Sequence, residues 1–319
     1  EKLIVAKKIK YGVIGVGHLG NFHVKQLLNI GSVELIGVYD EDPKRLNEIS
    51  QNYNVPKIKA IKDLLKLADA VSIVTPTTTH KDIALLALDN DCHIFIEKPI
   101  THDLDSARCV ESKVKKLQKV AHVGHIERFN PVIKKFNEEI HKPLFLECHR
   151  LSKLSNRSMD ISVILDLMIH DIDLVIHMID SPVKNIIADG VNVVSNSIDL
   201  ANVKLSFENG CVVNLTASRI SDKNMRKIRM FENNCYTSLD LLNHKLSKHY
   251  AKFSQENNQL NLENKQIAVN QYDALKEELQ YFCNAINANN IDFSNIDFSI
   301  RSLEIALEIN NIIQSKLNQ

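Results

Sequence analysis

A glycine-rich stretch near the start of this 319-residue chain constrains its fold more than any other feature. An apolar run ending in Ile14 leads into Gly15-x-Gly17-x-x-Gly20, and a helical pattern follows. In such a motif the first glycine allows a tight turn, the second lets the backbone approach a pyrophosphate, and the third lets the helix pack against the strand. A simple tight turn is the alternative interpretation. The motif predicts that the cofactor contacts Gly15, Gly17, His18, Leu19 and Gly20.

A second apolar run ends in Asp40, twenty residues after the motif. A carboxylate at this point would meet the ribose of an adenine nucleotide, although a turn or helix cap is also possible. The order strand, glycine turn, helix, strand and acid favours dinucleotide binding. Glu41 and Asp42 would repel the 2′-phosphate of NADP, whereas the basic Lys44 and Arg45 follow closely. We therefore predict NAD as the cofactor.

The composition argues against several classes of partner. Lys+Arg and Asp+Glu both number 39, so the net charge gives no indication of nucleic-acid or membrane binding. The 6 cysteines are scattered, as in a reduced cytoplasmic protein, and show no zinc-site spacing. No apolar stretch is long enough for a signal peptide or a membrane span. We expect a cytoplasmic protein that acts on a small molecule and binds neither nucleic acid nor a membrane.

Strands and helices alternate through the first part of the chain. After Asp40, helices are expected at 43–53, 61–67, 81–90 and 103–116, and strands at 70–75, 93–97 and 119–123. This alternation predicts an α/β Rossmann domain at 1–125, with a doubly wound parallel sheet. Thr75, Pro76 and His80 follow one strand at its carboxyl end, where such sheets bind ligands, and we include them among the cofactor contacts.

The stretch Glu97-Lys98-Pro99 directly follows the strand at 93–97. Both charged residues would lie at a carboxyl end, beside the ligand crevice, so Glu97 and Lys98 are further candidate cofactor contacts. Lys98 could also hydrogen-bond a substrate hydroxyl or stabilise an alkoxide. A surface Glu–Lys pair before a turn is the alternative.

The pattern changes from residue 126. A strand is expected at 143–151, an antiparallel hairpin at 191–216 with its turn at 208–210, and further short strands up to about residue 249. Helices are expected at about 159–179, 272–288 and 300–317. This predicts an α+β domain at 126–319 with a large, mostly antiparallel open sheet. We expect this domain to bind substrate and to form a homodimer or homotetramer through the open face of its sheet.

The helix expected at 159–179 carries a polar stripe. Asp166 and His170 are four residues apart and would share one helix face, which Asp173 and His177 extend. The stripe is open to three interpretations: a plain polar face, a metal site, or acid–base chemistry. In the last, Asp166 fixes the tautomer of His170, which accepts a hydroxyl proton near neutral pH. The sequence shows no third ligand group, so we predict no metal.

Together these motifs resemble the Gfo/Idh/MocA family of sugar dehydrogenases. The matching residues are the glycine motif, Thr75-Pro76-x-x-x-His80, Glu97-Lys98-Pro99 and Asp166-x-x-x-His170-x-x-Asp173. The resemblance implies a nicotinamide held between the two domains and a catalytic group of Lys98, Asp166 and His170. It also implies a cis peptide bond between Lys98 and Pro99. One departure is that many members have a Gly-Gly pair shortly before the helix aspartate, which this chain lacks.

The stretch Val123-Gly-His-Ile-Glu-Arg-Phe-Asn-Pro131 resembles a narrower branch, the nucleotide-sugar 3-dehydrogenases acting on UDP-N-acetylglucosamine. A basic segment from Arg219 to Arg229 also fits, because clustered basic residues suit a diphosphate, although it could be a solvated loop. The branch implies oxidation of the C3 hydroxyl to a 3-keto sugar, for cell-envelope glycan biosynthesis. The alternatives are a free-sugar or inositol dehydrogenase and an NAD-binding sensor without turnover. Candidate substrate contacts are Lys98, His125, Arg128, Asn130, Arg157, Asp166, His170 and Arg219.

Overall fold

The computed structural model describes residues 8–154, 161–254 and 259–318. By its internal contacts the chain divides into two units. The first comprises Glu1–Ile126 and Asp273–Arg301, and the second comprises Glu127–Tyr272 and Ser302–Gln319. Among the described residues, no helix combines the length and apolarity that a membrane span needs.

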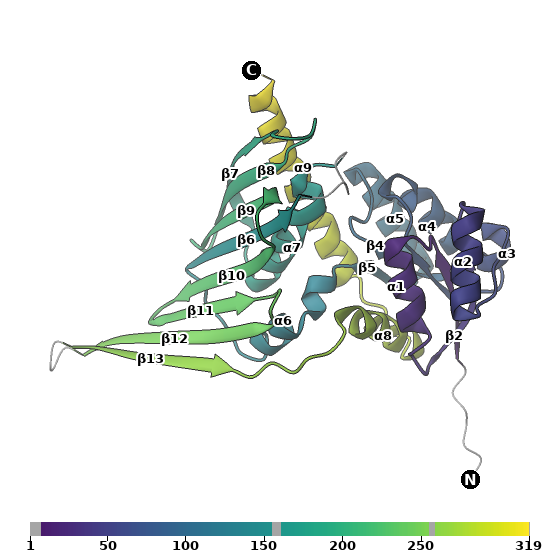
Figure 1. Ribbon diagram of the computed structural model, residues 1–319, viewed down its shortest axis with the longest axis horizontal. Coiled ribbons are helices and arrows are strands. Elements are labelled where there is room, and N and C mark those ends of the chain that lie inside the picture. Colours follow the sequence, from purple (N-terminus) through teal and green to yellow (C-terminus); the bar gives the residue numbers. More distant parts are fainter. Residues whose placement is uncertain (1–7, 155–160, 255–258, 319) are drawn as a thin grey trace, which may run out of the picture. The chain divides into compact units, whose positions relative to one another are not determined.

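The first unit is built on a five-stranded parallel sheet (Figure 1). Its strands are β1 (Ile9–Ile14), β2 (Val33–Tyr39), β3 (Ala70–Ile73), β4 (His93–Glu97) and β5 (Ala121–Gly124), in the order β2-β1-β3-β4-β5. Its helices are α1 (His18–Leu27), α2 (Pro43–Tyr53), α3 (Ile61–Leu65), α4 (His80–Asp89), α5 (Leu104–Leu117) and α8 (Ala274–Asn287), with a 3-10 turn η1 (Thr77–Thr79). The predicted α/β Rossmann fold is confirmed.

Helix α8 comes from far along the chain but packs on this sheet. Its Phe282 makes edge-to-face contacts with Tyr11 of β1 and Phe95 of β4, at centroid distances of 6.2 and 5.8 Å. Val24 and Leu27 of α1 belong to the same buried core. Residues 273–301 therefore belong with the first unit, whereas the sequence-based division had placed them in the second. The apolar face that a helix buries decides its partner, and sequence order does not reveal that face.

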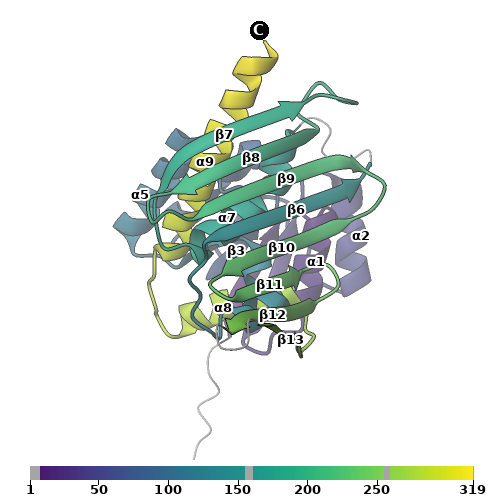
Figure 2. The same cartoon turned by 90° about the vertical axis from the view of Figure 1, so that its left-hand side faces the viewer.

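The second unit is built on an eight-stranded sheet. Its strands are β6 (Phe145–Lys153), β7 (Val183–Val191), β8 (Leu200–Phe207), β9 (Val212–Ser221), β10 (Met225–Glu232), β11 (Cys235–Asp240), β12 (Lys245–Ser254) and β13 (Gln259–Ile267). They lie side by side in the order β13-β12-β11-β10-β6-β9-β8-β7 (Figure 2). Only the pairing of β6 with β9 is parallel among these described strands. The predicted large, mostly antiparallel sheet is confirmed.

The hairpin predicted at 191–216 is formed by β8 and β9, with Ser206 paired to Val212 and Gly210 at a φ of +88° in the turn. The strands at both edges of the sheet, β7 and β13, were not predicted. Edge strands bury little side-chain surface, so their apolar alternation is weak. In β13, for example, Leu260 and Leu262 are both exposed.

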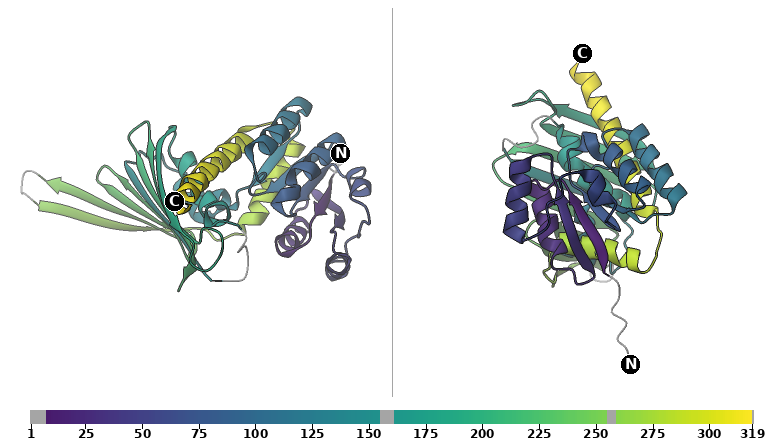
Figure 3. Two further views of the ribbon diagram at one scale, coloured as in Figure 1. Left: turned by 90° about the horizontal axis from the view of Figure 1, so that it is seen from above. Right: turned by 90° about the vertical axis from the view of Figure 1, so that its right-hand side faces the viewer.

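Helical elements cover one face of the second unit's sheet. They are a 3-10 turn η2 (Ile126–Phe129), α6 (Pro131–Phe136), a π-helical turn η3 (Ile164–Met168), α7 (Ile169–Met178) and the C-terminal part of α9 (Ser294–Leu317). In the left view of Figure 3 the C-terminal end of the yellow α9 lies beside the sheet. A Cβ atom at Gly190 of β7 would lie 3.0 Å from Ile313 of α9, so a glycine permits this close approach.

Candidate active site

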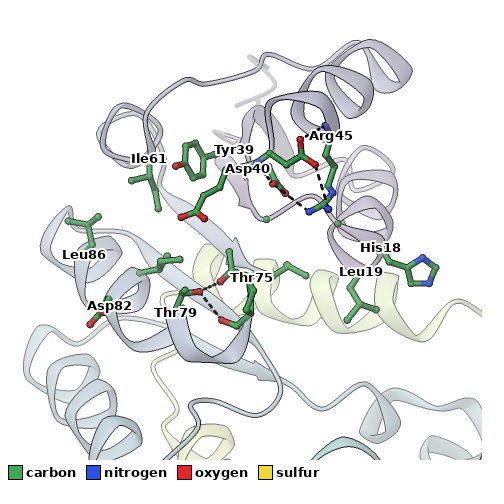
Figure 4. Close-up of a pocket in the computed structure, with 17 residues that line it drawn as sticks. His18, Leu19, Tyr39, Asp40, Arg45, Ile61, Thr75, Thr79, Asp82 and Leu86 are labelled. Atoms are coloured by element: carbon green, nitrogen blue, oxygen red, sulfur yellow. Dashed lines mark hydrogen bonds and ion pairs between the residues drawn. The ribbon is translucent and has the colours of Figure 1, made fainter. Parts of the chain in front are cut away.

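A cavity of about 810 Å³ opens in the first unit at the carboxyl ends of β1, β2 and β3 (Figure 4). The sequence of this region dictates its shape, because Gly15 has a φ of +86° and a side chain there would collide with Val74. Gly17 caps helix α1, which begins at His18. Lining residues include Gly15, Gly17, His18, Leu19, Tyr39, Asp40, Arg45, Thr75, Pro76 and Thr79. The cavity has the size and position of a nucleotide site at the end of a parallel sheet.

The carboxylate of Asp40 is fixed in this cavity by the backbone. Its Oδ2 accepts from the N–H of Val16 at 2.8 Å, and its Oδ1 accepts from the N–H of Asp42 at 2.9 Å. The guanidinium of Arg45 lies 3.6 Å from the same carboxylate. Each carboxylate oxygen keeps a second acceptor position, which suits the two ribose hydroxyls of an NAD molecule. The residues present therefore fit the cofactor that the motif predicts.

Some of the residues after β3 line the cavity, and others hold the backbone of this segment in place. Thr75 and Pro76 line the cavity, and the hydroxyl of Thr79 donates toward the Thr75 hydroxyl and the Pro76 carbonyl, both at 2.8 Å. His80 is buried, and its ring nitrogens lie 2.9 Å from the Thr75 carbonyl and 3.0 Å from the Pro99 carbonyl. His80 therefore connects the segment after β3 with the segment after β4. It is not among the cavity-lining residues.

At the end of β4, Glu97 and Lys98 are partly buried. Oε1 of Glu97 lies 2.9 Å from Nε2 of His23, and Oε2 accepts from the backbone N–H of Lys98 at 3.3 Å. Burial by itself raises the pKa of Glu97, but the hydrogen bond and charge of His23 and the charge of Lys98 outweigh it, so the pKa lies below its ordinary value. The Lys98–Pro99 peptide bond is cis, as predicted.

In the second unit, Asp166 lies in the π-helical turn η3 and His170 lies in the first turn of α7. A regular helix was expected across 159–179. Of that range, residues 159 and 160 lie outside the described residues, and the turn at Ile164–Met168 is wider than an α-helical turn. Residues four apart are therefore not stacked as they are in a regular α-helix. Short π-helical turns occur frequently at functional sites.

Two buried ion pairs anchor α7. Asp171 accepts from Nη2 of Arg150 on β6 at 2.7 Å, and Arg150 also reaches Glu127 at 2.8 Å. Asp173 accepts two hydrogen bonds from Arg128, at 2.5 and 2.6 Å. Because Asp171 and Asp173 are two residues apart, they project from different sides of the helix. Sequence reasoning missed the pair Asp171–Arg150, although a charged residue in the apolar pattern of α7 was a usable signal.

Several predicted substrate contacts are engaged within the second unit. Arg128 binds Asp173, and the buried side chain of Asn130 caps α6 by accepting from the N–H of Val132 at 3.0 Å. The guanidinium of the buried Arg219 lies 3.7 Å from Asp199. His125, in the first unit, is also buried. Arg157 lies outside the described residues.

Strand alternation separates the basic residues of the segment after Arg219. On β10, Ile228 and Met230 are buried, so Arg226 lies on their helix-covered face of the sheet, whereas Lys227 and Arg229 lie on the opposite face. Arg226 is about half exposed, and its Nη1 lies 3.2 Å from Glu127. The basic residues therefore do not form one cluster. The described residues also contain no group of three or more potential metal ligands.

Comparisons with known proteins agree with this architecture. A family model described as an oxidoreductase family with an NAD-binding Rossmann fold matches residues 9–125, and the Gfo/Idh/MocA C-terminal domain model matches residues 137–232. A UDP-N-acetylglucosamine 3-dehydrogenase from Acidithiobacillus ferrooxidans is 34% identical over 98% of this chain and 99% of its own length. Its solved structure superposes with a TM-score of 0.89 over 97% of this chain and 98% of that chain.

Other proteins are similar over less of the sequence or at lower identity. A scyllo-inositol 2-dehydrogenase (NAD(+)) from Bacillus subtilis is 32% identical over 39% of this chain and 37% of its own length. A scyllo-inositol dehydrogenase from Lactobacillus casei, solved with bound NAD(H) and scyllo-inositol, is 18% identical in sequence. Its structure shares the fold, with a TM-score of 0.80 over 97% of this chain and 98% of that chain. By the family models and the relative that spans both units, this protein belongs to the Gfo/Idh/MocA family of NAD-binding oxidoreductases.

Proposed function

We propose that this protein uses NAD to oxidise the C3 hydroxyl of UDP-N-acetylglucosamine to the 3-keto sugar. The observation that carries the proposal is the 34% identity to a UDP-N-acetylglucosamine 3-dehydrogenase over 98% of the chain. By sequence, four inositol dehydrogenases match 39 to 52% of the chain. A 3-keto nucleotide sugar could serve as an intermediate in the biosynthesis of cell-envelope glycans. We place the protein in the cytoplasm, where NAD is available to it.

NAD, when bound, supplies a hydride acceptor at C4 of the nicotinamide. We assign the chemistry of this chain to Lys98, Asp166 and His170, which match the family motif. His170 accepts the hydroxyl proton, Asp166 stabilises the charged imidazole, and Lys98 stabilises the developing alkoxide. The fixed carboxylate of Asp40 supports NAD over NADP, because a 2′-phosphate would meet its negative charge.

Replacing the assigned groups tests this chemistry. We expect Lys98→Met and His170→Ala to lower kcat by about 10²- to 10⁴-fold, the usual contribution of a positioned proton-transfer group. NAD affinity should stay within a factor of two or so, because the contacts around Asp40 are intact. His177→Ala on the same helix is the control and should keep the wild-type kcat. Near-normal turnover by His170→Ala would refute its role as the base.

The substrate assignment is tested by absorbance at the NADH band with NAD and a panel of UDP-sugars, free sugars and inositols. UDP-N-acetylglucosamine should give the highest kcat/KM. Preferred turnover of an inositol or a free sugar would contradict the nucleotide-sugar assignment. NAD binding without turnover of any compound would instead support a sensor.

A further inference from the structure

A buried chain of polar side chains crosses the first unit and ends at Glu97. The hydroxyl of Tyr11 on β1 lies 2.9 Å from the hydroxyl of Ser72 on β3. The Ser72 hydroxyl lies 3.1 Å from Nδ1 of His23 on α1, and Nε2 of His23 lies 2.9 Å from Oε1 of Glu97. Tyr11 and Ser72 are 0% exposed and His23 is 1% exposed. We call these four residues the Tyr11–Glu97 chain.

One arrangement of protons satisfies every member of the chain. The Tyr11 hydroxyl donates to Ser72, the Ser72 hydroxyl donates to Nδ1 of His23, and Nε2–H of His23 donates to the carboxylate of Glu97. Consecutive hydrogen bonds that point the same way strengthen one another in a buried environment. A donor at Nε2 also stabilises the ionised form of a buried carboxyl, consistent with the lowered pKa of Glu97.

The surroundings leave room for the Glu97 carboxylate and place titratable side chains of α1 and of the end of β4 against it. On β5 the residue paired with Glu97 is Gly124, where an added Cβ would lie 3.1 Å from Oε1 of Glu97. The titratable groups that act on Glu97 include His23 from α1 and Lys98 from the same strand end, and Glu97 in turn acts on His80 of α4. Lys98 is thus next to a carboxylate that is held by the buried His23 and by the backbone N–H of Lys98 itself.

We propose that His23 is a positioning residue for Lys98: through the Tyr11–Glu97 chain it fixes a carboxylate beside Lys98 and keeps that lysine charged. The functional consequence rests on the role given to Lys98 under the proposed function. It also connects α1, whose N-terminus closes the glycine turn, with the lysine at the end of β4. Without the donor at His23, the partly buried Glu97 would favour its neutral form more, and Lys98 would lose part of the neighbouring negative charge.

A purely structural role is the competing explanation, and the chain contains a matched control for it. His122 of β5 lies 3.0 Å from Glu278 of α8, and both residues are buried. Both His–Glu pairs contact the core around Phe95, whose ring centroid lies 5.2 Å from His23 and 5.1 Å from His122. A role limited to stability would make the two histidines equivalent in their effect on activity.

The first measurement compares turnover of UDP-N-acetylglucosamine in paired variants. His23→Met removes the donor to Glu97, and His23→Gln retains an N–H near the position of Nε2. We expect His23→Met to lower kcat by tenfold or more with an unchanged Kd for NAD, and His23→Gln to restore most of the loss. His122→Met should lose comparable thermal stability and keep the wild-type kcat. Equal kcat values in His23→Met and His122→Met would overturn the proposal.

A second measurement needs no substrate. Competitive acylation of lysines, read by mass spectrometry on the peptide that contains Lys98, reports the neutral fraction of this amine. We expect acylation of Lys98 in His23→Met to be faster by about tenfold, the effect of one pKa unit. If His23→Met does not fold, Ser72→Ala provides the test and should change the rate in the same direction by a smaller factor.

These two readouts separate failure of the inference from failure of the proposed function. If the wild type does not turn over UDP-N-acetylglucosamine, the substrate assignment is wrong, and the acylation rates alone decide the role of His23. Unchanged Lys98 acylation in His23→Met or Ser72→Ala would refute the positioning role, whatever the substrate.

Discussion

At the scale of single residues, two carboxylates are fixed by backbone N–H groups for different purposes. Asp40 accepts from Val16 and Asp42 inside the nucleotide cavity. Asp199, fully buried before β8, accepts from the N–H groups of Val193, Val194 and Ser195 at 2.8 to 3.0 Å. The first keeps acceptor positions available for a ligand, whereas the second satisfies the loop 193–199 itself.

Asp199 gives the fold a defined dependence on pH. Burial raises the pKa of its carboxyl, but the hydrogen bonds from Ser195 and from the backbone outweigh burial and lower the pKa to about 2. The pKa of Asp199 is lower in the folded state than in the unfolded state, so the ionised carboxylate stabilises the folded protein above about pH 4. This stabilisation is about 2 to 3 kcal/mol and is lost as the pH falls toward 2. In urea unfolding, the free energy of unfolding of Asp199→Asn should therefore be lower than that of the wild type. This difference should become smaller between pH 5 and pH 3.

The matched control is Asp189→Asn. Asp189 also pairs with a cation, Lys316, but its side chain is 71% exposed. An exposed ion pair contributes little, so this variant should unfold like the wild type at both pH values. If Asp199→Asn lowered the free energy of unfolding by the same amount at every pH, its effect would come from packing and not from ionisation.

Asp40 should determine the choice of cofactor. In Asp40→Ala, the hydrogen bonds to the ribose hydroxyls are lost, and we expect KM for NAD to rise by about 10- to 100-fold, since hydrogen bonds to charged groups contribute about 1.5 to 3 kcal/mol. The preference for NAD over NADP should fall at the same time, because the repulsive charge is gone. Equal kcat/KM values of the wild-type enzyme for NAD and NADP would contradict this account and would point to Arg45 as a phosphate ligand.

At the scale of elements, strand β10 offers a direct test of how a diphosphate is recognised. Arg226 lies on the helix-covered face of the sheet, and Arg229 lies on the opposite face. If the diphosphate binds on the helix-covered face, Arg226→Ala should raise KM for UDP-N-acetylglucosamine by about tenfold, as expected for one charge-assisted hydrogen bond. Arg229→Ala, which removes the same charge from the same strand, should leave KM unchanged. Equal effects of the two variants would indicate that only net charge matters.

Sequence patterns predicted the elements that have strong periodicity. The glycine motif, the parallel strands around it and the hairpin that turns at Gly210 all follow from local chemistry. The π-helical turn at Ile164–Met168 did not, because helical periodicity differs only slightly between α and π turns. Arg128 and Asn130 stay predicted substrate contacts from a motif; the structure adds that Arg128 binds Asp173 and that Asn130 caps α6. Tertiary partners of polar residues cannot be deduced from spacing alone.

At the scale of the whole molecule, the open face of the second unit's sheet has an aromatic row. Phe231 and Tyr236 stack at a centroid distance of 5.1 Å, and Tyr236 and His249 stack at 5.2 Å, across β10, β11 and β12. Residues facing the opposite side of these strands, such as Thr237 and Leu239, are buried. We propose that this row lies in the interface of a homodimer or homotetramer.

Tyr236→Glu should therefore reduce the molar mass measured by size-exclusion chromatography with light scattering, because a charge would be buried in the interface. Tyr281→Glu on α8 is the control, since that side chain is 49% exposed in the first unit. A wild type that runs as a monomer at micromolar concentration would refute the proposed assembly, and an unchanged mass in Tyr236→Glu would place the interface elsewhere.

This member of the Gfo/Idh/MocA family is, by the function proposed above, a nucleotide-sugar 3-dehydrogenase. The most direct measurement is the incubation of the purified protein with NAD and UDP-N-acetylglucosamine, followed by NADH absorbance and by NMR of the sugar product. We predict stoichiometric formation of NADH and a ketone at C3, with free N-acetylglucosamine and inositols converted at least tenfold less efficiently. A ketone at another carbon, or faster oxidation of an inositol, would contradict the account.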